Sequence, residues 1–255
     1  MPNKALGQHW LKDRSIIAEI ADSAKIAADD TVLEIGPGLG TLTSELLRRA
    51  KQVVAVEFDS DLARKLPGQF PGKNLQVIAT DILQFDLNSL PVGYKVVANV
   101  PYYITSKIVQ RLMTASNKPS LAVLLVQKEV AERIVAKPGD MSILAVSTQI
   151  FAEASLGIEV SKSYFTPPPK VDSQVVILET RPAPIIATAD ERAFFRIVKA
   201  GFASRRKKLR SSISAGLAIS KPAAEELLTH ANIDPEKRAE DLSIVDWQRL
   251  ARDAV

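Results

Sequence analysis

A glycine-rich turn between a short apolar run and an amphipathic stretch constrains the fold of this chain most strongly. Residues 32–35 are apolar apart from Glu34, residues 36–40 are Gly-Pro-Gly-Leu-Gly, and residues 42–50 have helical spacing. Glycines let the backbone turn sharply and approach a ligand closely where a strand is followed by a helix. A β-branched run at residues 52–58 comes next, so this segment predicts a βαβ unit in a parallel sheet.

The first 180 residues continue to alternate strand-like runs with helical patterns. Strands are predicted at residues 32–35, 52–58, 76–80, 95–100, 121–127, 151–160 and 173–179, and helices at residues 14–26, 42–50, 62–66, 106–115 and in a long stretch from Lys128. No helix joins the last two strands, so we expect them to pair antiparallel, because a parallel return requires a crossover of about a dozen residues. The predicted fold class is therefore α/β, with a doubly wound, seven-stranded, Rossmann-like sheet of five parallel strands and an antiparallel hairpin.

A proline-rich segment, Arg-Pro-Ala-Pro at residues 181–184, ends this alternation. Such a segment is typical of a connection between domains, and no strand-like run follows it. Helices are predicted at residues 189–203, 205–217, 221–231 and 244–254. We therefore predict an α/β domain at residues 1–182 and a small all-helical domain at residues 183–255.

The composition argues against several kinds of site. The chain has no cysteine, which excludes disulfides, iron–sulfur clusters and cysteine zinc sites, and its two histidines lie far apart in sequence, which makes a histidine-built metal site improbable. The longest apolar run, residues 121–126, is far shorter than the roughly 20 residues that span a bilayer. The N-terminus lacks the pattern of a signal peptide. We expect a cytoplasmic, monomeric protein without a membrane partner.

The glycine turn suits a nucleoside-containing cofactor. Its three glycines alternate, unlike the nicotinamide-type pattern, whose third glycine would fall one position later. Glu57 ends the second predicted strand, where an acidic residue conventionally binds ribose hydroxyls, and Asp81 and Ile82 at the end of the third offer an acceptor for an adenine amino group beside an apolar wall. Singly, both acids could be solvated strand ends. Together, the pattern predicts that S-adenosylmethionine is bound by Gly36, Gly38, Glu57, Asp81 and Ile82.

A second motif, Asn99-Val100-Pro101-Tyr102, follows the fourth predicted strand. The lone pair of an adenine amino group is delocalised into the ring, so carbonyl acceptors for its N–H bonds make the nitrogen a better nucleophile. We predict that the Asn99 side chain and a backbone carbonyl beside Pro101 are these acceptors and that the base stacks on Tyr102. By itself the motif would more often be a simple turn. With the cofactor motif it predicts methyl transfer to adenine without a metal.

These motifs, together with residues 6–11, 165–172 and 201–211, resemble the ribosomal RNA adenine N6-dimethyltransferase family, most closely its bacterial small-subunit branch. The resemblance implies a substrate of two adjacent adenines in the hairpin loop near the 3′ end of small-subunit (16S) rRNA. It implies a role in small-subunit biogenesis, with the immature subunit as the partner. It also implies that an N-terminal segment, residues 1–30, covers the cofactor.

The resemblance further implies individual site residues. His9 and Leu11 would line the cofactor pocket with Asn99, and Phe165 would face Tyr102 across the target base. Taken without the resemblance, His9 would be a surface residue and Phe165 a core aromatic that anchors the proline loop. Three positions depart from the frequent family residues: His9 replaces Asn, Trp10 replaces Phe, and Val100 replaces Leu.

Three other functions remain open at this point. They are a large-subunit (23S) rRNA adenine N6-methyltransferase of the macrolide-resistance type, a DNA adenine methyltransferase, and a ribosome-assembly checkpoint factor that acts mainly by binding. The alternating glycines and the triple proline at residues 167–169 fit the small-subunit branch better.

Positive charge is concentrated after the proline-rich segment. Residues 1–180 carry 19 basic and 19 acidic side chains, whereas residues 181–220 carry 9 basic and 2 acidic ones. An acid-free run within 15 residues contains seven cations: Arg196, Lys199, Arg205, Arg206, Lys207, Lys208 and Arg210. Apolar residues at helical spacing lie among them, so we predict a rigid surface that binds the RNA backbone. The alternative is a solvated helix face.

Overall fold

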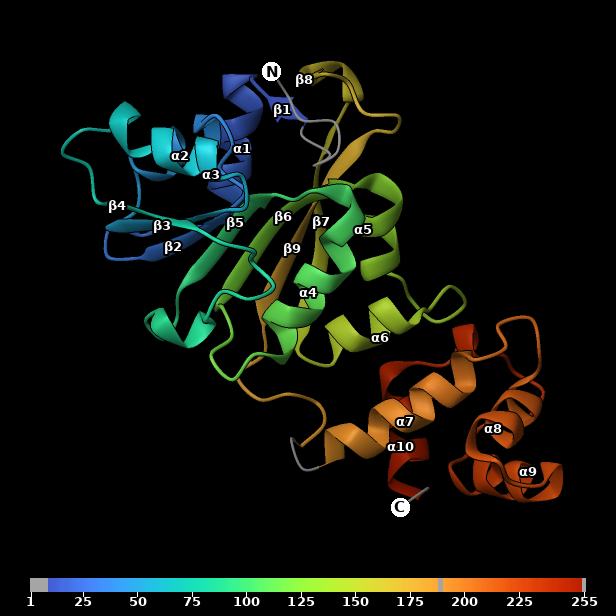
Figure 1. The fold of residues 1–255 in the computed structure, drawn as a ribbon. Coiled ribbons are helices and arrows are strands. Elements are labelled where there is room, and N and C mark those ends of the chain that lie inside the picture. Colours follow the sequence, from blue (N-terminus) through green and yellow to red (C-terminus); the bar gives the residue numbers. More distant parts are fainter. Residues whose placement is uncertain (1–8, 188–189, 254–255) are drawn as a thin grey trace. The chain divides into compact units, whose positions relative to one another are not determined.

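The computed structural model describes residues 9–187 and 190–253 (Figure 1). The chain divides into two compact units. The first unit comprises Met1–Glu132 and Glu153–Thr180, and the second comprises Arg133–Ala152 and Arg181–Val255. The division into domains at residues 1–182 and 183–255 stays a prediction, and the second unit also includes Arg133–Ala152 from the predicted α/β domain.

The first unit is built around a seven-stranded sheet. Its strands are β2 (Thr31–Ile35), β3 (Gln52–Glu57), β4 (Leu75–Ala79), β5 (Lys95–Asn99), β6 (Leu121–Gln127), β7 (Ala152–Val160) and β9 (Ser173–Thr180). They are hydrogen-bonded in the order β4-β3-β2-β5-β6-β9-β7. Strands β2 to β6 are parallel, and β9 is antiparallel to β6. The predicted α/β, Rossmann-like architecture is confirmed.

The two closing strands are neighbours, as predicted, but the later strand lies inside the sheet. β9 is hydrogen-bonded to β6 on one side and to β7 on the other. Val175, Val176 and Leu178 of β9 are accordingly buried. β7 forms the edge, and most of its residues are partly or fully exposed.

Helices cover both faces of this sheet (Figure 1). They are α1 (Arg14–Ser23), α2 (Thr41–Leu46), α3 (Ser60–Lys65), α4 (Thr105–Thr114) and α5 (Lys128–Ile134). α1 and α2 pack on one face, where Ile17 and Leu46 join Val53 and Val97 in a buried cluster. α4 covers the opposite face with Ile108 and other apolar side chains. Single turns of 3₁₀ helix occur at Pro67–Gln69, Leu87–Ser89, Tyr102–Ile104, Lys162–Tyr164 and Ala239–Asp241.

The long helix predicted from Lys128 is wrong. It is two short helices, α5 and α6 (Ile143–Gln149), separated by a loop that contains Pro138 and Gly139. Proline has no N–H to donate within a helix, and Gly139 has a φ of 113°, outside the helical region. The Ser142 side chain then accepts a hydrogen bond from the Ala145 N–H and begins α6.

A two-stranded sheet that the sequence did not predict joins distant parts of the first unit. β1 (Trp10–Leu11) pairs antiparallel with β8 (Phe165–Thr166). Trp10 is opposite Thr166, and Leu11 is opposite Phe165. This pairing fixes the described start of the chain beside the loop that contains the triple proline.

The described residues of the second unit form helices and connecting loops, and among them only Ala152, the first residue of β7, belongs to a strand. It contains α6, α7 (Glu191–Phe202), α8 (Leu209–Leu217), α9 (Lys221–His230) and α10 (Ile244–Asp253). Phe202 stacks on the buried Trp247, and a Cβ atom on Gly201 would approach that indole to 2.3 Å, so only glycine fits there. The helix predicted at residues 205–217 begins at Leu209 instead, and residues 205–208 form a turn. The predicted helix ends at Ala189 and Ala254 lie outside the described residues.

Two kinds of feature are absent from the described residues. None of the helices has both the length and the apolar composition needed to cross a membrane. Among these same residues, no group of three or more His, Cys, Asp or Glu side chains is arranged to hold a metal ion.

Candidate cofactor and base-binding site

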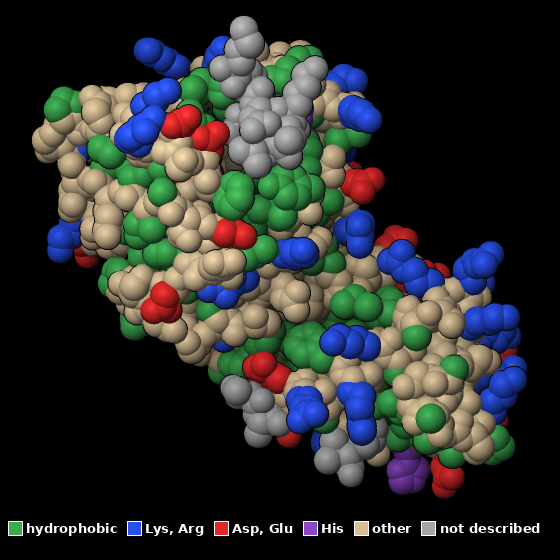
Figure 2. All heavy atoms as spheres, viewed as in Figure 1, with side chains coloured by type: hydrophobic (Ala, Val, Ile, Leu, Met, Phe, Trp, Pro, Cys, Tyr) green, Lys and Arg blue, Asp and Glu red, His purple; other side chains and the backbone are tan. Residues whose placement is uncertain are grey.

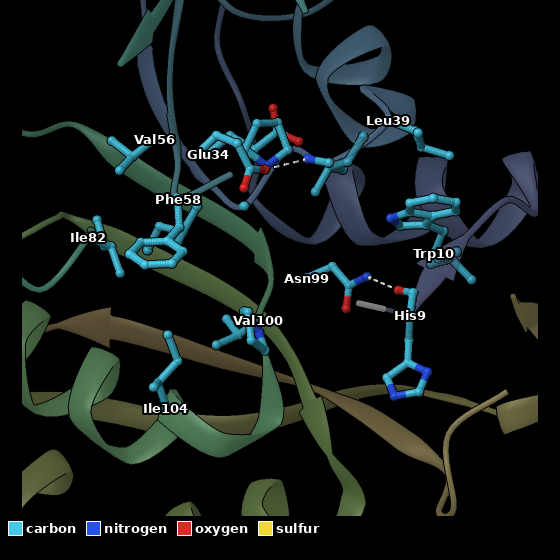
Figure 3. A pocket seen from close by; sticks show the side chains of 18 of the residues that line it. His9, Trp10, Glu34, Leu39, Val56, Phe58, Ile82, Asn99, Val100 and Ile104 are labelled. Carbon is cyan, nitrogen blue, oxygen red and sulfur yellow. Dashed lines mark hydrogen bonds between the residues drawn. The ribbon is translucent and has the colours of Figure 1, made fainter. Parts of the chain in front are cut away.

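A cavity of about 340 Å³ lies at the carboxyl ends of β2, β3, β4 and β5 in the first unit (Figure 3). Each strand contributes the residues that directly follow it, and residues 9–11 close another side. Ligands bind at this edge of open α/β sheets because the loops there diverge. The cavity therefore lies where the sequence motifs placed the cofactor.

The glycine turn after β2 forms one wall of the cavity. Gly36 and Gly38 have φ values of 68° and 56°, which L side chains rarely adopt. The Gly36 N–H donates to the Val56 carbonyl at 2.9 Å, which holds the turn against β3. Gly40 serves packing instead, because a Cβ atom there would lie 2.8 Å from Leu66 Cδ1.

Glu57 connects the end of β3 to this turn. Its Oε2 atom accepts from the Gly38 N–H at 3.0 Å, and its Oε1 atom accepts from the Asp59 N–H at 2.9 Å. The side chain is buried, and this burial raises the pKa of the carboxyl group. Glu57 is therefore a fixed acceptor in the cavity wall, with lone pairs left for hydroxyl donors.

The segment after β4 supplies a polar and an apolar contact. Asp81 Oδ1 accepts from the Leu83 N–H at 2.9 Å, which fixes the carboxylate at the cavity edge. Ile82 is buried, and Arg111 Nε donates to its carbonyl at 3.1 Å. Phe58, an exposed ring that sequence reasoning missed, lies near Ile82 (Figure 3). Its position directly after Glu57, the last residue of β3, is the sequence feature that could have assigned it to the site.

Asn99 lies at the end of β5 with a fixed amide orientation. Its Nδ2 atom donates to the His9 carbonyl at 3.2 Å, which turns Oδ1 away from that carbonyl (Figure 3). Because the donor side of the amide is engaged, the acceptor oxygen remains for another partner.

Pro101 and Tyr102 continue the same wall. The Pro101 carbonyl accepts from the Ile104 N–H at 3.2 Å and the Thr105 hydroxyl at 3.4 Å, and Pro101 caps the 3₁₀ turn Tyr102–Ile104 that precedes α4. The Tyr102 hydroxyl is hydrogen-bonded to Ser173 Oγ at 2.6 Å. Burial raises the pKa of Tyr102. The ring is therefore held at its polar end while its body lines the cavity.

Glu34, the residue before the last of β2, is a lining residue that sequence reasoning did not assign to the site. It is 1% exposed, and neither carboxylate oxygen has a hydrogen-bond partner among the described residues. Burial raises its pKa to about 8, and the nearby charge of Glu57 adds to the shift. The sequence feature that could have assigned Glu34 to the site is a carboxyl group inside an otherwise apolar strand.

The structure brings together most of the predicted cofactor and base residues. The cavity is lined by His9, Leu11, Gly36, Gly38, Glu57, Asp81, Ile82, Asn99, Pro101 and Tyr102. Phe165 is not part of this lining: it is 3% exposed and packs in the core cluster that includes Leu11. The predicted place of Phe165 across the base from Tyr102 therefore stays a prediction; in this structure Phe165 is paired with Leu11 in the small sheet.

The predicted RNA-binding cations all belong to the second unit, where Figure 2 shows exposed Lys and Arg side chains. Arg196 and Lys199 lie on α7, and Arg205, Arg206 and Lys207 lie in the turn before α8. These five are exposed and have no ion pair within the described residues. The other two are paired: Lys208 contacts Glu236, and Arg210 contacts both Glu225 at 3.1 Å and Glu236 at 2.7 Å.

Comparison with known proteins shows the family of this chain. The family model described as "Ribosomal RNA adenine dimethylase" matches residues 2–254. The chain belongs to this family. A relative from Dehalococcoides mccartyi (strain CBDB1), named ribosomal RNA small subunit methyltransferase A, is 44% identical over 251 residues, which are 97% of this chain and 86% of the relative. A Moorella thermoacetica relative with the same name is 39% identical and covers 99% of this chain and 92% of its own.

Two solved structures share the whole architecture of this rRNA adenine dimethylase. A dimethyladenosine transferase from Plasmodium falciparum has a TM-score of 0.82 at 30% identity and covers 95% of this chain and 96% of its own. The 23S rRNA methyltransferase ErmE has a TM-score of 0.78 at 31% identity and covers 96% and 98%. The enzyme class predicted from the sequence, an rRNA adenine dimethyltransferase, is thereby confirmed.

Proposed function

We propose that this enzyme uses S-adenosylmethionine to dimethylate the N6 amino groups of two adjacent adenines in the hairpin loop near the 3′ end of small-subunit rRNA. The relatives named small subunit methyltransferase A support this choice of RNA. The observation that carries the chemistry is that the glycine turn, two strand-end acids and the Asn99–Tyr102 segment line one cavity. We further propose that the enzyme acts as a cytoplasmic monomer on the immature small subunit.

The cavity residues fit the cofactor. The left-handed glycines keep side chains out of the turn, so the backbone itself meets the ligand. Glu57 is held where it can accept from ribose hydroxyls, and Asp81 and Ile82 flank the place for adenine. The remaining contacts are assigned to His9, Leu11, Gly36, Gly38 and Asn99. When bound, S-adenosylmethionine supplies an electrophilic methyl group.

The substrate amine is oriented by two carbonyl acceptors. Asn99 Oδ1 accepts one N–H, because the amide nitrogen is already bound to the His9 carbonyl. The Pro101 carbonyl is occupied by Ile104 and Thr105, so we assign the second acceptor role to the Val100 carbonyl on its other side. Two preorganised acceptors favour a pyramidal nitrogen whose lone pair faces the methyl donor. The base itself stacks on Tyr102.

The second methyl transfer requires a change in these contacts. The monomethylated amine has only one N–H, so it satisfies only one of the two acceptors. The amine must rotate to present its lone pair again, and the cavity must hold the first methyl group. Exposed Tyr103, at the cavity edge, leaves that side open.

The exposed cations of the second unit would bind the RNA backbone. Each Lys or Arg can neutralise one phosphate and release its counterion. Arg196, Lys199, Arg205, Arg206 and Lys207 are the principal candidates, because Lys208 and Arg210 already have acidic partners.

A large-subunit substrate is the second candidate, because ErmE shares the fold across 96% of this chain. The small-subunit assignment is favoured by the higher identity to the relatives of that name. Transfer of labelled methyl groups to isolated fragments of both RNAs tests the choice. We expect incorporation into the small-subunit hairpin, and preferential incorporation into the large-subunit fragment would contradict the proposal.

A further inference from the structure

The His9 imidazole lies against the Tyr102 ring, in a contact that the proposed reaction does not use. The two ring centroids are 5.8 Å apart, and the ring planes differ by 21°. This geometry is typical of a stacked aromatic pair. Both residues line the cavity, so the imidazole lies on a ring to which the proposed function assigns the target base.

A base does not fit between these two rings as they stand. A base stacked on both would require two contact distances of about 3.5 Å each, the closest favourable separation of carbon atoms. Their sum exceeds the 5.8 Å that separates the centroids, and any lateral offset makes the gap between the planes smaller still. The imidazole and an incoming base therefore compete for this face of Tyr102.

The attachments of His9 allow its ring to leave while its backbone stays. The His9 carbonyl accepts from Asn99 Nδ2, and the next residue, Trp10, pairs with Thr166 in the small sheet. Apart from the stack, the ring has one hydrogen bond within the described residues, between Nδ1 and the Pro167 carbonyl at 2.8 Å. In Figure 3 the imidazole projects away from the carbonyl that holds Asn99. A side-chain rotation would thus free Tyr102 without disturbing Asn99.

We propose that the His9 imidazole occupies the base-stacking face of Tyr102 in the RNA-free enzyme and that an adenine entering the cavity displaces it. This inference rests on the proposed function for the identity of the base. It gives His9 a role in base entry, in addition to a backbone contact that positions Asn99. Displacement requires a flat base that stacks on Tyr102 better than an imidazole does, and adenine has the larger ring system.

The first test concerns the contact itself and needs no RNA. The chain has two histidines, His9 and His230, so their imidazole NMR signals are readily assigned. The Tyr102 ring current should shift the His9 signals, and Tyr102→Leu should remove that shift while the His230 signals stay unchanged. Unchanged His9 signals in Tyr102→Leu would overturn the proposal.

The second test measures displacement. With S-adenosylhomocysteine present, His9→Asn should bind the hairpin with two adjacent adenines about three- to tenfold more tightly than wild type, because no ring has to leave. His9→Phe, which keeps a ring on Tyr102, should not bind more tightly. A hairpin with uridines at both positions should bind wild type and His9→Asn equally. Equal or weaker binding of the adenine hairpin by His9→Asn would overturn the proposal.

Methylation of the same hairpin by wild type reports the proposed function separately. Binding with the expected His9 effects but without methylation would contradict that function and leave the displacement standing. Methylation without any His9 effect would support the proposed function and overturn the displacement of His9.

Discussion

The cavity of the first unit and the basic turn of the second unit use charge in opposite ways. In the cavity, Glu34 and Glu57 are buried, and burial raises the pKa of both carboxyl groups. In the turn, Arg205, Arg206 and Lys207 are exposed. Buried groups act through position and protonation state, whereas exposed charges act through number and are screened by salt. We therefore expect the cavity to respond to single-atom changes and to pH, and the turn to respond to net charge and ionic strength.

The largest effect on the reaction should come from Asn99 in the cavity. Asn99→Ala removes a preorganised acceptor, so methyl transfer should fall by about 10²–10³, while cofactor affinity falls much less. Single-turnover rates and calorimetry measure the two quantities. Asn88→Ala, at an exposed asparagine of the same unit, is the control and should retain wild-type rates. Near-normal turnover by Asn99→Ala would remove the amide from the mechanism.

Glu34 should give the cavity a pH-dependent stability. Its folded-state pKa is raised from 4.5 to about 8, so its stabilising contribution is complete below pH 4.5 and is lost as pH rises towards about 8. Over that window the free energy of unfolding should fall by about 2–4 kcal/mol on this account. Glu57, whose pKa is also raised, contributes in the same direction.

Glu34→Gln keeps the size of the side chain and removes the titrating proton. Urea unfolding at several pH values between about 4.5 and 8 should show a smaller loss of stability in this variant than in wild type. The same pH dependence in both proteins would mean that Glu34 ionises as freely as it does in the unfolded chain.

The two acids assigned to cofactor binding, Asp81 and Glu57, should have smaller effects than Asn99. Asp81→Ala and Glu57→Ala each lose a charged hydrogen bond, so S-adenosylmethionine binding should weaken by about 1.5–3 kcal/mol. Glu57→Ala also frees the Gly38 N–H, so its loss should be the larger. Asp61→Ala, at an exposed acid paired with Arg64, is the control. Unchanged cofactor affinity in both cavity variants would place these acids outside the binding site.

The basic turn should give the smallest effect per residue. Reversing Arg205, Arg206 and Lys207 to Glu should weaken RNA binding about tenfold or more and flatten its salt dependence, with a slope change of roughly 0.7–0.9 per lost phosphate contact. Cofactor affinity should stay unchanged.

A control with the same change in net charge makes this test specific. Lys51, Lys65 and Lys73 are exposed lysines of the first unit, and their reversal to Glu should leave the salt slope near that of wild type. Equal slopes for the two triple variants would show that the turn acts only through overall charge.

Features that depend on local sequence could be predicted. The glycine turn and Asp81 follow strands, Glu57 and Asn99 end strands, and parallel strands place their carboxyl ends at one edge. Local sequence therefore predicted their meeting in the cavity. The antiparallel pairing of the last two strands was also predicted from local sequence, because no crossover helix joins them.

Features that depend on distant contacts were not predicted. Strands β1 and β8 have two residues each and lie more than 150 positions apart, so neither has a periodic signal of its own. Without that pairing, the burial of Phe165 and the contact between His9 and Tyr102 could not be anticipated. Residues 205–208 had helical spacing, but the chain turns there before α8 begins at Leu209. The break at Pro138 and Gly139 did have a local signal, and the prediction overlooked it.

The central claim is that one cavity transfers two methyl groups to each of two neighbouring adenines. Mass spectrometry of the small-subunit hairpin, after exhaustive reaction with the purified enzyme and S-adenosylmethionine, tests it most directly. We predict N6,N6-dimethyladenine at both adjacent positions, with the monomethyl form only at early times. Monomethyladenine as the final product, or modification at a single position, would contradict the account.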